Sequence, residues 1–131
     1  MKRIPATGKR PKQYVISSVP IVRENVIDRD DDMFTDEILK NMDDTRVPIF
    51  RDFNYEKQIG IGILHYRDGI GLNAELKINK DERIGGLIPC LGFKAECRKK
   101  TKDHYEYSGK CEAIAIGLCK KNSDIGIPAI K

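Results

Sequence analysis

The chain has 131 residues, of which 40% are hydrophobic and 34% charged. This composition is typical of one soluble globular domain and is too apolar for an intrinsically disordered chain. No apolar run approaches the roughly 18 residues that a membrane span needs, and the basic start is not followed by the apolar stretch of a secretory signal. We therefore expect no membrane contact, and four cysteines kept reduced in the cytosol.

The positive charge is concentrated at the N-terminus. The net charge is +4, and the first 13 residues carry five basic side chains and no acidic one. These five are Lys2, Arg3, Lys9, Arg10 and Lys12. Pro5, Gly8 and Pro11 disfavour regular structure here, so we expect residues 1–13 to form an extended arm and residues 14–131 to form one domain. Such an arm suits contact with an acidic protein surface or with nucleic acid, and a merely solvated terminus is the alternative.

The first part of the domain predicts a strand, a short helix and a second strand. β-branched residues favour a strand over residues 14–19, and a polar loop follows at 23–32. Thr35 is a suitable N-cap, and helical apolar spacing with acids in the first turn predicts a helix over 36–42. Residues 47–50 form a short apolar run that predicts another strand.

The second part of the chain predicts a hairpin followed by further strands. Residues 59–66 and 72–78 flank a turn centred on Asp68 and Gly69, and the second run alternates apolar and polar residues. The remaining predicted strands lie at 90–98, 105–108 and 110–119, with a short edge strand at 125–130. We therefore expect a mainly β fold, a small, strongly curved antiparallel sheet or partly closed barrel with one short helix.

An acidic stretch matches a calcium-binding loop only in part. Asp28, Asp30 and Asp32 occupy the first, third and fifth positions of that pattern. The sixth position, normally glycine, is Met33, and the twelfth, normally glutamate, is Leu39. We expect a solvated acidic loop there, no metal site and no cofactor.

The four cysteines do not form a zinc knuckle. Cys90, Cys97, Cys111 and Cys119 contain no C-x2-C pair, so a zinc site that also uses His104 is the less favoured interpretation. Strand parity predicts that Cys97 and Cys111 are core thiols. Cys90 could be a nucleophile only with a base, and His65 and His104 are the only histidines.

Five segments, taken in order, resemble one protein family. They are "NVIDRDDDMFTDEIL", "PIFRDFNYEKQIG", "DGIGLNAELKI", "PCLGF" and "EAIAIGLCKKNSDIGIP". Together they resemble the loop, helix and strand motifs of the prohead (head maturation) proteases of tailed bacteriophages, over roughly residues 15–130. The resemblance implies a β-barrel of the herpesvirus-protease type.

The resemblance also implies where the catalytic residues would lie. The position of the family's nucleophilic serine falls on Cys90. The position of its histidine falls on Phe53, and that of the following aspartate on Asn54. A phenylalanine cannot accept a proton, and general-base catalysis contributes about 10²–10⁴ in rate.

Two functions remain open on this basis. The first, which we expect, is a non-catalytic virion protein that decorates or stabilises the capsid, binds the major capsid protein and has no catalytic residue. It would assemble in the host cytoplasm, with a homo-oligomer on the capsid and contact between the arm and nucleic acid both possible. The alternative is a divergent cysteine-type maturation protease that uses Cys90 with His65 or His104. An unrelated β-type binding module is a third interpretation.

Overall fold

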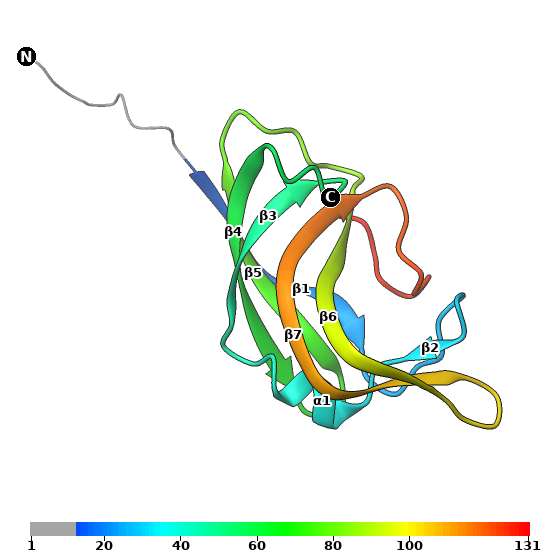
Figure 1. Ribbon diagram of the computed structural model, residues 1–131. Helices are drawn as coiled ribbons and strands as arrows, with labels where there is room; N and C mark the ends of the chain where they lie inside the picture. The colour runs from blue at the N-terminus through cyan, green and yellow to red at the C-terminus, as the bar shows by residue number, and fades with distance from the viewer. Residues whose placement is uncertain (1–12) are drawn as a thin grey trace, which may run out of the picture.

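The computed structural model describes residues 13–131 (Figure 1). The five basic residues of the predicted arm, Lys2, Arg3, Lys9, Arg10 and Lys12, lie outside the described residues. No helix within the described part of the chain is long and apolar enough to cross a membrane.

Residues 13–131 form seven strands and one short helix, which confirms a mainly β fold. In chain order the elements are β1 (Gln13–Arg23), β2 (Asp32–Met33), α1 (Asp36–Lys40), β3 (Arg46–Arg51), β4 (Gln58–Arg67), β5 (Gly71–Asn79), β6 (Ile88–Lys100) and β7 (Tyr105–Cys119).

The strands form one curved sheet that is mixed and not closed. The order is β1-β5-β4-β3-β7-β2, and β6 also pairs with β7. The sheet curls until β1 and β6 come into contact, but no ladder joins these two strands (Figure 1). The prediction of an antiparallel sheet is wrong for β2 and β3, which both run parallel to β7. Long stretches of chain separate β7 from both strands, and only such long connections permit parallel pairing.

The local predictions that depend on short-range chemistry are confirmed. The Thr35 side chain caps α1 by accepting a hydrogen bond from the Ile38 N–H, and the helix buries Ile38 and Leu39. The β4–β5 hairpin turns at Gly69, which adopts a positive φ of 77°. Along β5, Leu72, Ala74, Leu76 and Ile78 are fully buried, as the alternating pattern requires.

β7 is one strand where the sequence predicts two, because a bulge joins the halves. Gly109 adopts a φ of 77°, and the register shifts between the Ala95–Cys111 pair and the Cys97–Ser108 pair. Past this bulge the β6–β7 hairpin projects from the body (Figure 1). Cys97 is therefore exposed and the prediction of a core thiol is wrong for it, whereas Cys111 is half-buried against the core.

The last residues form an irregular strap, not the predicted edge strand. This C-terminal strap, residues 120–131, is tied at one end to β1 through an Arg23–Asp124 ion pair. Near its other end, the Ile130 N–H donates to the Leu87 carbonyl at 2.8 Å, just before β6 begins. Ile127 and Ile130 are buried. The strap therefore bridges β1 and β6, which no ladder joins to each other.

Truncation of Leu76 tests the placement of the core. We expect Leu76→Ala to lower the free energy of unfolding by about 2–5 kcal/mol, because the side chain is fully buried. The neighbouring Lys77→Ala should change it by no more than about 0.5 kcal/mol, since that side chain points to the other face. Urea denaturation measures both, and equal effects would contradict the described register.

Candidate functional site

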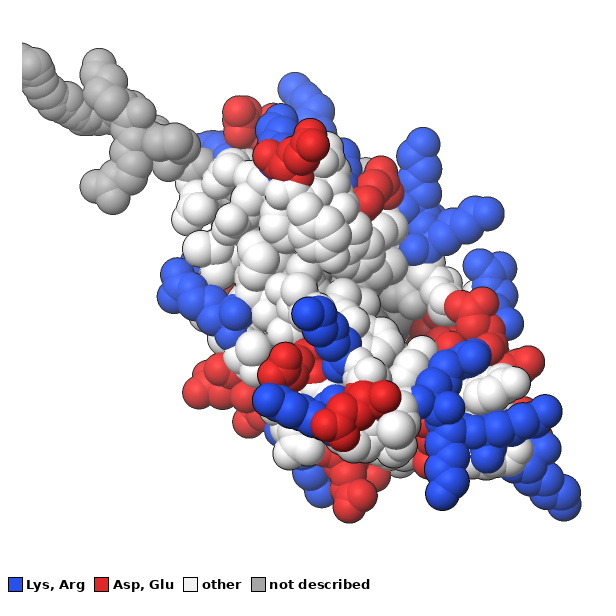
Figure 2. All heavy atoms as spheres, in the orientation of Figure 1, with Lys and Arg blue, Asp and Glu red and all other residues white. Residues whose placement is uncertain are grey.

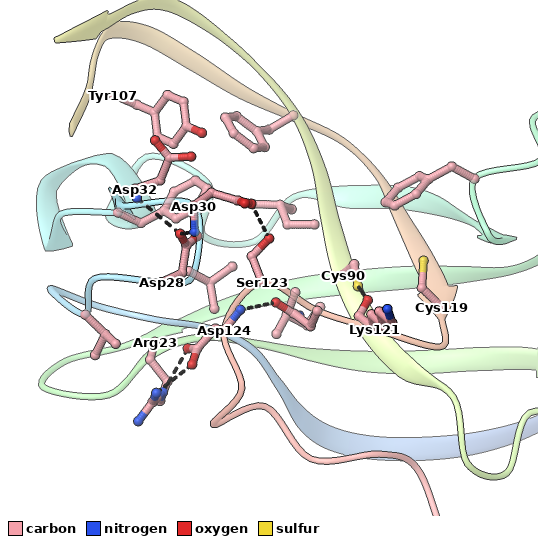
Figure 3. Close-up of a pocket in the computed structure, with 18 residues that line it drawn as sticks. Arg23, Asp28, Asp30, Asp32, Cys90, Tyr107, Cys119, Lys121, Ser123 and Asp124 are labelled. Carbon is pink, nitrogen blue, oxygen red and sulfur yellow. Dashed lines mark hydrogen bonds and ion pairs between the residues drawn. The ribbon is translucent and has the colours of Figure 1, made fainter. Parts of the chain in front are cut away.

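A cavity of about 330 Å³ lies at the opening between β1 and β6 (Figure 3). The ends of β1 and β7, the start of β6, the loop before α1 and the C-terminal strap all contribute to its lining. One part of the lining carries two thiols and Phe53, and another carries four aspartates and three aromatic rings in mutual contact.

The thiols belong to the paired strands β6 and β7. Cys90 pairs directly with Gly117, so these residues and their second neighbours Gly92 and Cys119 share one face of the sheet. The Cys90 thiol donates a hydrogen bond to the Lys121 carbonyl at 3.2 Å. Burial raises the pKa of Cys90 to about 12, and the neighbouring Cys119 thiol adds to the effect. Cys90 is therefore protonated and weakly nucleophilic at neutral pH.

The Phe53 ring covers this same face. A Cβ placed on Gly92 would lie 2.8 Å from the ring, and a Cβ on Gly117 would overlap it. Only glycine at both positions admits the ring so close to the sheet. Phe53 and Cys90 thus line the same cavity, whereas the adjacent Asn54 is exposed.

A tight turn holds Phe53 in place. Asp52 and Phe53 have φ values of 50° and 55°, a conformation that costs most residues roughly 1–2 kcal/mol each. The Asn54 N–H closes the turn on the Arg51 carbonyl at 2.9 Å, and the Asp52 N–H donates to the Leu118 carbonyl at 3.0 Å. These bonds fix the ring over β7 despite the unfavourable backbone.

The acidic part of the cavity is built from the loop that precedes α1. Asp28, Asp30 and Asp32 each bring a carboxylate oxygen within 4.8 Å of the others. Asp28 Oδ1 accepts hydrogen bonds from the Asp30 N–H at 2.8 Å and the Asp32 N–H at 3.1 Å. Partial burial raises the pKa of Asp28, and the two neighbouring carboxylates contribute in the same direction.

Asp32 is buried, in contrast to the solvated loop that the sequence predicts. Arg98 Nε donates to its Oδ1 at 2.7 Å. Burial and a hydrogen bond to Asp32 together raise the pKa of Tyr107 to about 12. Tyr107, Phe34 and Phe93 pack against one another with ring centroids 4.8–5.0 Å apart. The carboxylates thus lie next to a compact aromatic cluster.

The strap supplies the last part of the lining. Arg23 Nε donates to Asp124 Oδ2 at 2.8 Å, and this ion pair holds the pKa of Asp124 below its usual value. The Ser123 hydroxyl donates to Asp30 Oδ2 at 2.6 Å. Sequence patterns did not single out Asp124 or the aromatic cluster, and they did not place Cys119 beside Cys90, because these residues come together only through the curl of the sheet.

Neither histidine lines the cavity. His65 is exposed on β4, and β3 and β7 separate that strand from β6. His104 lies at the end of the β6–β7 hairpin, where its ring nitrogens each lie 2.8 Å from a carboxylate oxygen of Asp103 or Glu106. The hydrogen bond with Glu106, followed by that with Asp103, raises the pKa of His104. Neither histidine is therefore placed to take a proton from Cys90.

The comparisons with known proteins identify no relative. No protein-family model, no curated protein and no solved structure matches the chain. The function has to be inferred from the chemistry of the cavity and from the motif resemblance.

Thiol labelling tests the environment of Cys90. At pH 8, iodoacetamide should modify the exposed Cys97 at least about tenfold faster than Cys90, because a thiol with a pKa near 12 is only about 10⁻⁴ thiolate there. The Cys90 rate should then rise about tenfold per pH unit up to pH 10, since that range lies below its pKa. Peptide mass spectrometry reports each site, with urea-unfolded chain as the control. Faster labelling of Cys90 than of Cys97 at pH 8 would refute this description.

A double-mutant cycle tests the contact between Phe53 and the sheet. Gly117→Ala should destabilise the chain by about 1–3 kcal/mol, because the added methyl overlaps the ring. In a Phe53→Ala background the same change should cost no more than about 0.5 kcal/mol, since the obstacle is gone. Urea unfolding gives the four free energies. An equal cost in both backgrounds would place the ring elsewhere.

Proposed function

We propose that the chain is a non-catalytic virion protein of a tailed phage, a capsid decoration or head-stabilising protein built on a degenerate prohead-protease-like fold. The observation that carries the proposal is the Phe53 ring, which covers the face of the sheet where Cys90 points. An aromatic ring lies where the motif resemblance expects a catalytic base.

The convergence of these two residues supports the resemblance. The motif resemblance places the protease histidine and serine positions on Phe53 and Cys90, which belong to short motifs far apart in the chain. In the folded chain both line one cavity at the sheet opening.

The chemistry of the cavity favours binding over catalysis. The Cys90 thiol donates to a carbonyl, and its raised pKa leaves almost no thiolate at neutral pH. The alternative, a cysteine protease that pairs Cys90 with His65 or His104, lacks a supporting contact, because both histidines lie outside the cavity.

The charge distribution supports a role on a larger assembly. The five cations of the N-terminal arm stand against a remainder whose 19 basic and 20 acidic residues nearly balance. A basic tether suits an acidic protein shell, and many identical sites on a capsid would give a small binder useful avidity.

Capsid pelleting tests this function. Purified chain is mixed with capsids of the phage that encodes it, and bound protein is measured after sedimentation. We expect Lys9→Gln/Arg10→Gln/Lys12→Gln to reduce capsid occupancy about tenfold, because the arm loses most of its charge. The control Lys99→Gln/Lys100→Gln/Lys102→Gln removes the same charge from the β6–β7 hairpin and should bind normally.

The same incubation tests for catalysis. We expect capsid protein to stay intact, with wild type and Cys90→Ala giving identical gels. Cleavage products that disappear with Cys90→Ala would establish the protease alternative, and failure of the wild type to pellet with capsids would reject the decoration role.

A further inference from the structure

We propose that the cavity at the β1–β6 opening receives the basic segment 2–12 of a second copy of the chain. Copies would then associate head to tail, with the arm of one in the cavity of the next. This inference concerns the purified chain in solution and goes beyond the proposed attachment to capsids.

The acidic side chains at the cavity outnumber the basic ones. Asp32 is paired with Arg98, and Asp124 with Arg23. Asp28 and Asp30 make no ion pair among residues 13–131, although both line the cavity. Lys121 also lines the cavity but is exposed and pairs with neither carboxylate, so one negative charge remains in excess. A cationic group that enters would relieve the repulsion among the three clustered carboxylates.

The aromatic cluster favours a cation that also carries an apolar chain. Phe34, Phe93 and Tyr107 line the cavity together with the aspartates. Lysine and arginine combine an apolar stem with a charged end, so the stem can lie along rings while the charge meets carboxylates. The lining therefore suits a basic side chain of a peptide segment.

The segment 2–12 supplies such side chains without opposing charge. It carries five basic residues and no acidic one. The other acid-free basic run, residues 98–102, is held in the β6–β7 hairpin, and its Arg98 already pairs with Asp32. Figure 2 shows the basic side chains around that hairpin interspersed with acidic ones. The N-terminal segment is therefore the better electrostatic match.

Geometry favours a second copy over the same chain. Ile21 and Arg23, at the end of β1, line the cavity, whereas segment 2–12 precedes Gln13 at the start of the strand. At about 3.3 Å per residue these two ends of β1 lie at most roughly 26–33 Å apart, since irregularities shorten the strand. Lys9 precedes Gln13 by four residues and can extend back only about 14 Å. The short connection limits how far Lys9, Arg10 and Lys12 extend toward their own cavity, whereas a neighbour's cavity carries no such limit.

Charge-reversal variants test the contact. We expect wild type to self-associate in sedimentation velocity runs at about 50 mM salt, and association to weaken at least about tenfold at about 500 mM. Lys9→Glu/Arg10→Glu/Lys12→Glu and Asp30→Lys should each be monomeric alone. An equimolar mixture should form complexes, because the Asp30→Lys variant keeps the basic arm and the triple glutamate variant keeps the acidic cavity.

Asp81→Lys makes the same charge change as Asp30→Lys at an exposed site outside the cavity lining and should associate like wild type. Circular dichroism melts verify that the variants are folded. The Asp30→Lys variant also separates this inference from the proposed function. Because it retains the basic arm, it should still pellet with capsids although it does not self-associate.

Three results would overturn the proposal. If the wild type stays monomeric at low salt, copies of the chain do not associate. If the mixture of the two variants stays monomeric, the arm of one copy does not dock in the cavity of another. Calcium binding by wild type that is lost in Asp30→Lys, without self-association, would assign the carboxylates to a metal instead.

Discussion

The contact between the Phe53 ring and the glycines of β6 and β7 organises the cavity. It needs no side chain at Gly92 and Gly117, and it needs a turn with two non-glycine residues at positive φ. Hydrogen bonds to β7 and within the turn hold that conformation. The ring then covers the face that carries Cys90, and burial suppresses ionisation of the thiol. The low acidity of the Cys90 thiol is therefore a property of packing, to which residues far apart in the sequence contribute.

The opening of the sheet explains why a cavity exists at all. A closed barrel would pair β1 with β6 and fill the space between them with backbone hydrogen bonds. Here the strap spans that gap by an ion pair at one end and a backbone hydrogen bond at the other. Between these anchors, the carboxylates, aromatic rings and thiols line an open space, where a closed barrel would have a ladder of backbone hydrogen bonds. The same gap that leaves the sheet open therefore provides the cavity.

Sequence reasoning succeeded where neighbours along the chain decide the structure. The Thr35 cap, the Gly69 turn and the alternation of β5 follow from local chemistry, and all three are present. It failed where distant segments decide. Strand parity gives the face on which Cys97 lies but not whether anything covers that face, and the hairpin leaves it exposed. The burial of Asp32 depends on Arg98 from β6, and the parallel β3–β7 pairing depends on the path of the whole sheet. No periodicity within a segment encodes such contacts.

The parallel pairing also bears on how the chain reaches this state during synthesis. Ile49 on β3 pairs with Ile116 on β7, so one edge of β3 has no partner until most of the chain exists. At a translation rate of about 5–20 residues per second, the intervening roughly 70 residues take about 3–14 s to appear. Throughout that interval the apolar residues of β3 border an unpaired strand edge, which is a template for pairing with other chains. The nascent chain thus passes through a period of aggregation risk that ends only when β7 leaves the ribosome.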